Sequence, residues 1–191
     1  SSDLTILNCV FADNTAQTTA SGWSNAYGGG IYNKNSNMIM SDCYFDNNQA
    51  LASSFSAAYG GAIFIQSSTI SINNTNILNS VASANAWRAR GGAVYNNSPN
   101  SYFENVKFQG NRCSTSSSKP AYGGGIYNGV GASTFVNCLF SGNKVSSSNA
   151  AGGAAMMNIS AQPKIINCTF SGNYNAATTS GSEGGGIYNN A

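Results

Sequence analysis

The sequence predicts an all-β protein, a right-handed parallel β-helix in which about six stacked turns, here called rungs, form one solenoid. Two motifs carry this prediction: Gly-Gly-Gly-Ile-Tyr-Asn at residues 28–33 and Cys-Tyr-Phe-Asp-Asn-Asn at residues 43–48. Both recur along the whole chain, and the Ile position returns at steps of 32, 31, 32, 30 and 31 residues. Units of that length cannot bury an apolar face alone, so they are expected to stack and to be covered by their neighbours.

The two motifs keep a constant separation. From each Ile position to the next Phe position the distance is 14 residues in all five cases, whereas the return distance varies between 16 and 20. A rigid unit therefore alternates with a segment of variable length. We expect the Ile and Phe positions to form two core ladders, which are Ile31, Ile63, Val94, Ile126, Met156 and Ile187, and Phe11, Phe45, Ile77, Phe108, Phe140 and Phe170.

Each rung is expected to open with two short strands and a corner between them. In the first rung Leu4-Thr5-Ile6 alternates apolar and polar residues, and Cys9-Val10-Phe11 does so again after Asn8. Short polar side chains tolerate the left-handed backbone that a corner needs. The sequence thus predicts an Asn corner ladder of Asn8, Asn74, Asn105, Asn137 and Asn167, with Asp42 in the second rung.

A second corner is expected at the Asn that closes Phe-x-x-Asn. Stacked amides at such a corner can bond the rungs above and below. Its members are Asn14, Asn48, Ser80, Asn111, Asn143 and Asn173.

Segments rich in Ala, Ser and Thr follow the second corner, and we expect them to be loops that vary on one face of the solenoid. They cover residues 15–26, 49–58, 81–89, 112–121, 144–151 and 174–182. The glycines then permit close backbone approach before a third strand, such as Ile31-Tyr32-Asn33. The prediction is three short strands per rung of ~31 residues, without helices.

Composition favours a single β-helix domain over residues 1–191 and excludes some partners. Only 7% of residues are charged and the net charge is +2 without a basic run, so binding to nucleic acid is not expected. No apolar run is long enough for membrane insertion. The chain starts at Ser1 without Met or a signal peptide, so we expect a processed chain or an excerpt of a longer one.

Four of the five cysteines share one position. Cys9, Cys43, Cys138 and Cys168 lie two residues before the Phe position, where the other rungs carry Thr75 and Val106, so the slot is small and buried. Stacked pairs meet the Cα spacing of a disulfide, but parallel in-register side chains make its torsion awkward, so we expect free thiols. Cys113 is expected in a loop without a partner.

The alternation of Gly-Gly-(Ala/Gly)-(Ile/Val) with Phe-x-x-Asn resembles the repeats of the chlamydial polymorphic outer-membrane protein family. More broadly, the chain resembles the right-handed β-helix passenger domains of secreted adhesins, the autotransporter-adhesin family. Departures are Ile77-Leu78-Asn79-Ser80 and the stretch at residues 153–158, Gly-Ala-Ala-Met-Met-Asn. The resemblance implies an extracellular or cell-surface location and an adhesive or structural role. It implies no catalytic residue.

Catalytic chemistry has little support in this sequence. A polysaccharide-cleaving site would need clustered carboxylates and a basic residue, whereas the chain has no His and only six acidic residues. The nearest in-register neighbours are Asp13 with Asn47 and Asp46 with Ala12, so no carboxylate pair forms. No catalytic residue, metal site or cofactor is predicted. The alternative is a pectate-lyase-like, carbohydrate-active enzyme whose catalytic rungs lie outside this segment.

An ice-binding face would need a regular threonine array. Thr5, Thr69 and Thr134 are expected near one another in register, but Ile39, Tyr102 and Lys164 interrupt that column. Two formal glycosylation sequons begin at Asn96 and Asn158, and chance in an Asn-rich chain is the favoured explanation.

The residue after the Ile position is aromatic in five of six rungs. Alternation points this column away from the core. It either stabilises the stack under an adjacent loop or forms an exterior platform for a glycan or a protein partner. The column is Tyr32, Phe64, Tyr95, Tyr127, Met157 and Tyr188, and Tyr27, Tyr59 and Tyr122 lie near it.

The two ends of the chain are compatible with each other. If Ala191 were joined to Ser1 of a second copy, Ile187 would precede that copy's Phe11 by 15 residues, close to the internal 14. Neither end has a recognisable polar cap. We therefore expect partners at both ends, which are either further repeats or copies of the chain stacked into a filament. The predicted function is an extracellular structural or adhesive rod that contacts a cell-surface glycan or protein.

Overall fold

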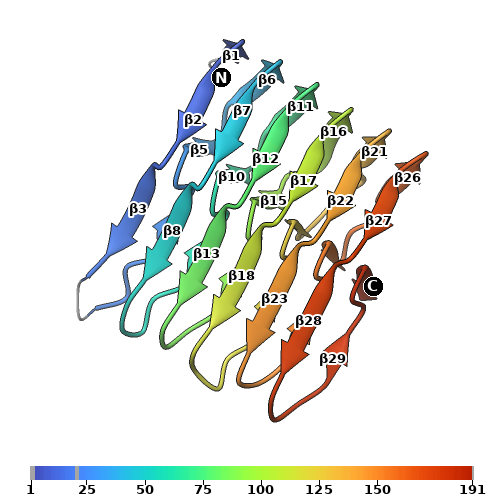
Figure 1. The fold of residues 1–191 in the computed structure, drawn as a ribbon. Coiled ribbons are helices and arrows are strands. Elements are labelled where there is room, and N and C mark those ends of the chain that lie inside the picture. Colours follow the sequence, from blue (N-terminus) through green and yellow to red (C-terminus); the bar gives the residue numbers. More distant parts are fainter. Residues whose placement is uncertain (1–2, 20–21, 191) are drawn as a thin grey trace.

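The computed structural model describes residues 3–19 and 22–190, and in these ranges thirty strands form five parallel six-stranded sheets. Six rungs of five strands lie one behind another from the N-terminal to the C-terminal end (Figure 1). The predicted fold class, an all-β parallel solenoid of about six turns, is confirmed. The proposed junction between Ser1 and Ala191 lies outside the described residues.

We name the sheets A to E in the order in which one rung visits them. Sheet A contains β1 (Asp3–Leu7), β6 (Asn37–Ser41), β11 (Thr69–Asn73), β16 (Asn100–Glu104), β21 (Thr134–Val136) and β26 (Lys164–Ile166). Sheet B contains β2 (Val10–Ala12), β7 (Tyr44–Asp46), β12 (Asn76–Leu78), β17 (Lys107–Gln109), β22 (Leu139–Ser141) and β27 (Thr169–Ser171). Sheet C contains β3 (Thr15–Thr18), β8 (Gln49–Ala52), β13 (Val81–Ala84), β18 (Arg112–Thr115), β23 (Lys144–Ser147) and β28 (Tyr174–Ala177).

The last two sheets complete each rung. Sheet D contains β4 (Ala26–Tyr27), β9 (Ala58–Tyr59), β14 (Ala89–Arg90), β19 (Ala121–Tyr122), β24 (Ala151–Gly152) and β29 (Ser182–Glu183). Sheet E contains β5 (Ile31–Lys34), β10 (Ile63–Gln66), β15 (Val94–Asn97), β20 (Ile126–Asn128), β25 (Met156–Ile159) and β30 (Ile187–Asn190).

The prediction of three strands per rung is wrong, because the segments expected to be variable loops contain sheets C and D. Many of their inward side chains are alanine, as at Ala50, Ala82 and Ala121, and they bury one another in a second core. A strand that alternates Ala with Ser has little contrast in hydrophobicity, so its period of two is weak in the sequence. Only the short connection between sheets C and D is a true loop.

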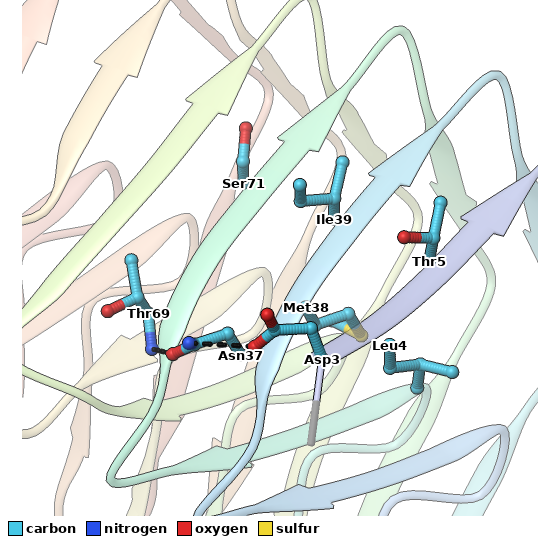
Figure 2. Close-up of a pocket in the computed structure, with 8 residues that line it drawn as sticks. All are labelled: Asp3, Leu4, Thr5, Asn37, Met38, Ile39, Thr69 and Ser71. Carbon is cyan, nitrogen blue, oxygen red and sulfur yellow. Dashed lines mark hydrogen bonds between the residues drawn. The ribbon is translucent and has the colours of Figure 1, made fainter. Parts of the chain in front are cut away.

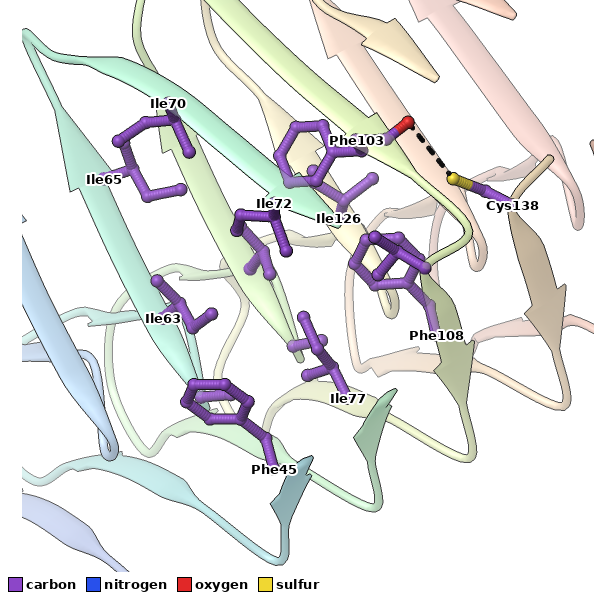
Figure 3. Packing of buried hydrophobic residues seen from close by; sticks show 14 of the residues in the cluster. Phe45, Ile63, Ile65, Ile70, Ile72, Ile77, Phe103, Phe108, Ile126 and Cys138 are labelled. Carbon is purple, nitrogen blue, oxygen red and sulfur yellow. Dashed lines mark hydrogen bonds between the residues drawn. The ribbon is translucent and has the colours of Figure 1, made fainter. Parts of the chain in front are cut away.

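The main core lies between sheets A, B and E, and like residues stack within it (Figure 3). The Phe ladder is in register from Phe11 to Phe170, and its rings lie parallel, for example 4.6 Å apart between Phe108 and Phe140. The Ile ladder is paired in the same way along sheet E. The inner members of both ladders are fully buried, whereas Phe11, Phe170 and Ile187 in the outermost rungs remain partly open to solvent.

The first corner has left-handed backbone in every rung. The φ angles of Asn8, Asp42, Asn74, Asn105, Asn137 and Asn167 all lie between 46° and 57°. Their side chains are exposed and bond from rung to rung: Asn105 Nδ2 donates to Asn74 Oδ1 at 3.0 Å, and Asn167 Nδ2 donates to Asn137 Oδ1 at 2.6 Å. A short amide therefore fulfils two requirements here, the positive φ and the ladder.

The second corner is buried and its amides satisfy backbone groups. Asn111 Nδ2 donates to Ile77 O at 2.9 Å and to Asn143 Oδ1 at 3.0 Å, while Asn111 Oδ1 accepts from Ser80 N at 2.9 Å. Asn143 repeats this pattern with Phe108 O and Asn173. Buried polar groups need such partners, so the ladder connects three rungs through each amide.

A third asparagine ladder was not predicted. On the inner face of sheet E, Asn96 Nδ2 donates to Asn128 Oδ1 at 3.1 Å, and Asn128 Nδ2 donates to Asn158 Oδ1 at 2.8 Å. All three residues are buried. The two sequon asparagines, Asn96 and Asn158, thus point into the solenoid, where a glycan has no room.

All five cysteines are free thiols. Cys113 corrects the prediction, because it lies in β18 and is buried in the alanine-rich core instead of in a loop. Burial raises the pKa of Cys113 and of Cys138 to about 12, so both thiols stay protonated at neutral pH. Buried thiols of this kind are poor nucleophiles.

The first glycine of each Gly-rich motif yields a testable prediction about the corner before sheet E. Gly91 has φ +69°, and a Cβ at this position would lie 2.2 Å from Val94 O, whereas Gly142 has φ +62° with no atom within 4 Å of its Cβ position. Gly142→Ala should cost about 1 kcal/mol, the strain of a left-handed alanine. Gly91→Ala should cost ~4 kcal/mol, because the clash is added to the same strain. Urea unfolding of both variants measures the difference, and equal losses would contradict the steric explanation.

Candidate functional site: an exterior aromatic seam

Outward-facing aromatic side chains of sheets D and E pack against one another across the glycine corner. The Tyr27 ring centroid lies 5.6 Å from that of Tyr32 and 4.8 Å from that of Phe64, and the Tyr59 centroid lies 5.0 Å from that of Tyr95. We call this surface the aromatic seam. Its members are Tyr27, Tyr59 and Tyr122 from sheet D, and Tyr32, Phe64, Tyr95, Tyr127, Met157 and Tyr188 from sheet E.

The sheet E half of the seam is a continuous ring stack over four rungs. Neighbouring rings from Tyr32 to Tyr127 lie 5.1, 5.1 and 5.2 Å apart and within 8° of parallel. In-register pairing imposes this spacing, because equivalent residues face each other directly. Met157 interrupts the stack before Tyr188.

The seam is only partly accessible. Tyr32 in the first rung is 52% exposed, whereas Phe64 and Tyr127 are each 3% exposed because side chains of sheet D cover them. Tyr95 and Tyr188 are half-buried. A ligand could therefore reach Tyr32 but not a continuous platform, and Tyr127→Ala would test stability more than binding.

Arg90 lies in the seam in place of a tyrosine. Its guanidinium Cζ is 4.9 Å from the centroid of the Tyr127 ring, a cation–π contact, and its Nε is buried without a hydrogen-bond partner in the described structure. Burial raises the pKa of Tyr95 to about 12, although the charge of Arg90 opposes that shift. Burial likewise raises the pKa of Tyr59, Tyr122 and Tyr127.

A second aromatic group, which we did not predict from the sequence, lies at the tips of the loops between sheets C and D. We call it the loop-tip cluster: Trp23, Phe55, Trp87, Arg88 and Lys119. Trp23 is 75% exposed and Phe55 is 59% exposed. The signal was present, since each of the three aromatic residues lies four or five residues before the first glycine of its motif. It was hidden because those segments were interpreted as polar loops.

A shallow depression of about 370 Å³ lies on the outer face of sheet A, near the N-terminal end (Figure 2). Its polar groups bond to one another: Asn37 Nδ2 donates to Asp3 Oδ1 at 2.9 Å, and Asn37 Oδ1 accepts from Thr69 N at 3.1 Å.

The strand register corrects the predicted threonine column. Thr69 pairs with Asn100, and the residue that pairs with Ile39 is Ser71 instead of Thr69.

Among the acidic residues, Glu183 lies in the sheet D column of the seam and raises the pKa of Tyr188 by a hydrogen bond, whereas the others lie apart from the seam. Asp13 Oδ1 accepts from Asn47 Nδ2 at 2.7 Å and Asp46 Oδ1 accepts from Asn79 Nδ2 at 2.9 Å. Within residues 3–19 and 22–190, no three His, Cys, Asp or Glu residues are grouped so that they could hold a metal ion. The described part of the chain also contains no apolar helix of the length needed to cross a bilayer.

These features define a parallel β-solenoid repeat protein. Residues 8–34 and 42–66 match the family model of the Chlamydia polymorphic membrane protein repeat, which confirms the resemblance for the first two rungs. Each matched segment begins at the Asn8 or Asp42 corner and ends in sheet E, so the family repeat has the phase of sheets B to E. No curated protein and no solved structure matches the chain.

The buried phenol of Tyr95 makes stability dependent on alkaline pH. Its pKa is raised from 10.0 to about 12, so the neutral form is favoured by folding. This contribution is complete below pH 10 and is lost as the pH rises towards 12. Tyr95→Phe keeps the ring stack and removes the titration, so its melting temperature should fall less steeply over this interval. A variant that falls as steeply as the wild type would contradict the assignment.

Proposed function

We propose that this chain is a structural and adhesive rod displayed at a cell surface. The repeat match in the first two rungs supports the location, because the matched family is one of membrane proteins. The interior supports the structural role, because three asparagine ladders and two core ladders join successive rungs. The loops that project from this interior would supply the adhesive contacts.

The observation that carries the adhesive part is the exposure of the loop-tip cluster. Trp23 and Phe55 are the most exposed aromatic pair in contact with each other, with ring centroids 6.1 Å apart. Elsewhere most large rings are stacked in the core or in the seam. Contiguous exposed apolar groups of this kind mark interaction sites.

Adhesion can be measured with beads that carry the purified chain. Beads coated with the wild type should bind cultured epithelial cells well above albumin-coated beads, and the double variant Trp23→Ala with Phe55→Ala should lose most of that binding. Tyr44→Ala, which removes an exposed ring on sheet B, is the matched control and should bind like the wild type. Equal adhesion of wild-type and albumin beads, or of the double variant and the wild type, would contradict the adhesive proposal.

The end rungs support stacking on further rungs. Apolar residues are exposed at both ends of the solenoid, including Leu4 at the N-terminal end and Ile165 and Ile187 at the C-terminal end. The first two rungs hold four of the six carboxylates and one lysine, whereas the last two hold Lys144, Lys164 and one glutamate. A head-to-tail contact would therefore place basic residues near acidic ones and continue the Phe ladder from Phe170 to Phe11. Either further repeats or second copies of the chain can provide it.

Sedimentation distinguishes self-stacking from continuation in the same chain. If copies stack, the sedimentation coefficient of the wild type should rise with concentration. Leu4→Lys should abolish this rise, because the lysine charge would have to be buried in the contact. Ile39→Lys, at an exposed site on the side of sheet A, should leave it unchanged. A wild-type monomer at every concentration would exclude self-stacking and leave further repeats as the partners of the ends.

A further inference from the structure

We propose that the loop-tip cluster binds an acidic saccharide, with a sugar ring against Trp23 and the carboxylate or sulfate near Arg88 and Lys119. The inference rests on the proposed adhesive function and names the ligand class of that surface. The cluster was not part of the aromatic column that the sequence pointed to, and it lies on a different part of each rung, the connection between sheets C and D.

The ring geometry leaves aromatic faces open. The Trp23 ring lies 5.6 Å from Trp87 at an interplanar angle of 74°, and it stacks on Phe55 at 27°. Trp87 thus supports Trp23 edge-on while most of the Trp23 indole remains in solvent. The face of an aromatic ring carries negative potential, and the C–H groups on one side of a pyranose carry positive potential, so the two surfaces attract each other.

Two cations lie on the supporting indole. Lys119 Nζ is 4.6 Å and Arg88 Cζ is 5.4 Å from the centroid of the Trp87 ring. Arg88 Nε is buried and has no hydrogen-bond partner in the described ranges, so an anion would have to bind through the other nitrogens of the guanidinium. An anionic group that approached the cluster would meet both charges, and guanidinium groups bind carboxylates and sulfates well.

The nearby carboxylates do not neutralise this charge. Asp13 and Asp46 bond to asparagines on the corner between sheets B and C, and Asp3 bonds to Asn37 on sheet A. Glu104 accepts a hydrogen bond from Tyr102 on sheet A. Arg88 and Lys119 therefore make the loop tips of the third and fourth rungs electropositive, which favours an acidic over a neutral ligand.

Size favours an oligosaccharide over a folded protein. The Trp23 ring lies 5.6 Å from the Trp87 ring, and Lys119 Nζ lies 4.6 Å from the same ring, so Trp23 and Lys119 Nζ are no more than about 10 Å apart. A short oligosaccharide covers that length, whereas a stable protein interface needs roughly 800 Å² on each partner. A net charge of +2 without a basic run also disfavours nucleic acid.

The tryptophan fluorescence of the chain reports on this cluster alone, because both tryptophans, Trp23 and Trp87, belong to it. Three tetrasaccharides serve as probes: chondroitin sulfate, unsulfated chondroitin and neutral maltotetraose. The first two share a carboxylate and differ in sulfate, so they separate the two anionic groups. We expect a saturable change in tryptophan emission with an acidic probe, little change with maltotetraose, and weaker binding at higher salt.

Variants assign the contacts. Trp23→Ala, read through Trp87, and the pair Arg88→Gln with Lys119→Gln should each weaken binding of the acidic probe at least tenfold. Phe55→Ala should weaken it less, since Phe55 lies behind the Trp23 ring. The control is Lys144→Gln, which removes a cation that contacts Tyr174 on sheet C, and it should change the affinity less than twofold.

Several results would overturn the inference. Maltotetraose binding as well as the acidic probes would remove the role of the cations, and an equal loss with Lys144→Gln would show non-specific attraction. A response to an acidic peptide but to none of the saccharides would assign the cluster to a protein segment. If none of the saccharides binds while coated beads still adhere to cells, the saccharide assignment fails and the adhesive function stands.

Discussion

The structure depends on parallel, in-register hydrogen bonding between successive rungs. Because each residue pairs with its equivalent in the next rung, every column of the solenoid must tolerate being stacked on itself. Flat rings and aliphatic side chains do so by dispersion and burial, which the Phe ladder shows at spacings of 4.6 to 4.8 Å. Charges do not, and the chain accordingly has only 7% charged residues.

The same constraint explains how asparagine can be buried in continuous columns. An amide carries both a donor and an acceptor, so a column of amides can satisfy itself, as Asn111, Asn143 and Asn173 do. Serine at position 80 completes the column with its backbone N–H and a hydroxyl that donates to Leu78 O. A carboxylate column would instead accumulate like charge, and in the exterior columns acids alternate with amides, as at Asp13 and Asn47.

The loops between sheets C and D are not bound by this in-register stacking. Here the chain leaves the ladders, and residues from alternate rungs can meet, as Trp23 and Trp87 do. The rigid solenoid keeps these tips at fixed separations, while the tips themselves can vary without disturbing the core. Stability and recognition are thus located in different parts of each rung, and a change at Trp23 is not expected to weaken the asparagine ladders.

The sequence alone determined the repeat, its phase, the Phe and Ile ladders and both Asn corners, because these columns use residue types whose chemistry is distinctive at a constant spacing. The prediction missed sheets C and D, since alternating Ala and Ser give little periodic signal, and it placed Cys113 in a loop for the same reason. Only the tertiary structure decided that sheet D covers Phe64 and Tyr127, and that Trp23, Phe55 and Trp87 meet. Those contacts depend on the angle between sheets and on the course of loops across rungs, which no local pattern encodes.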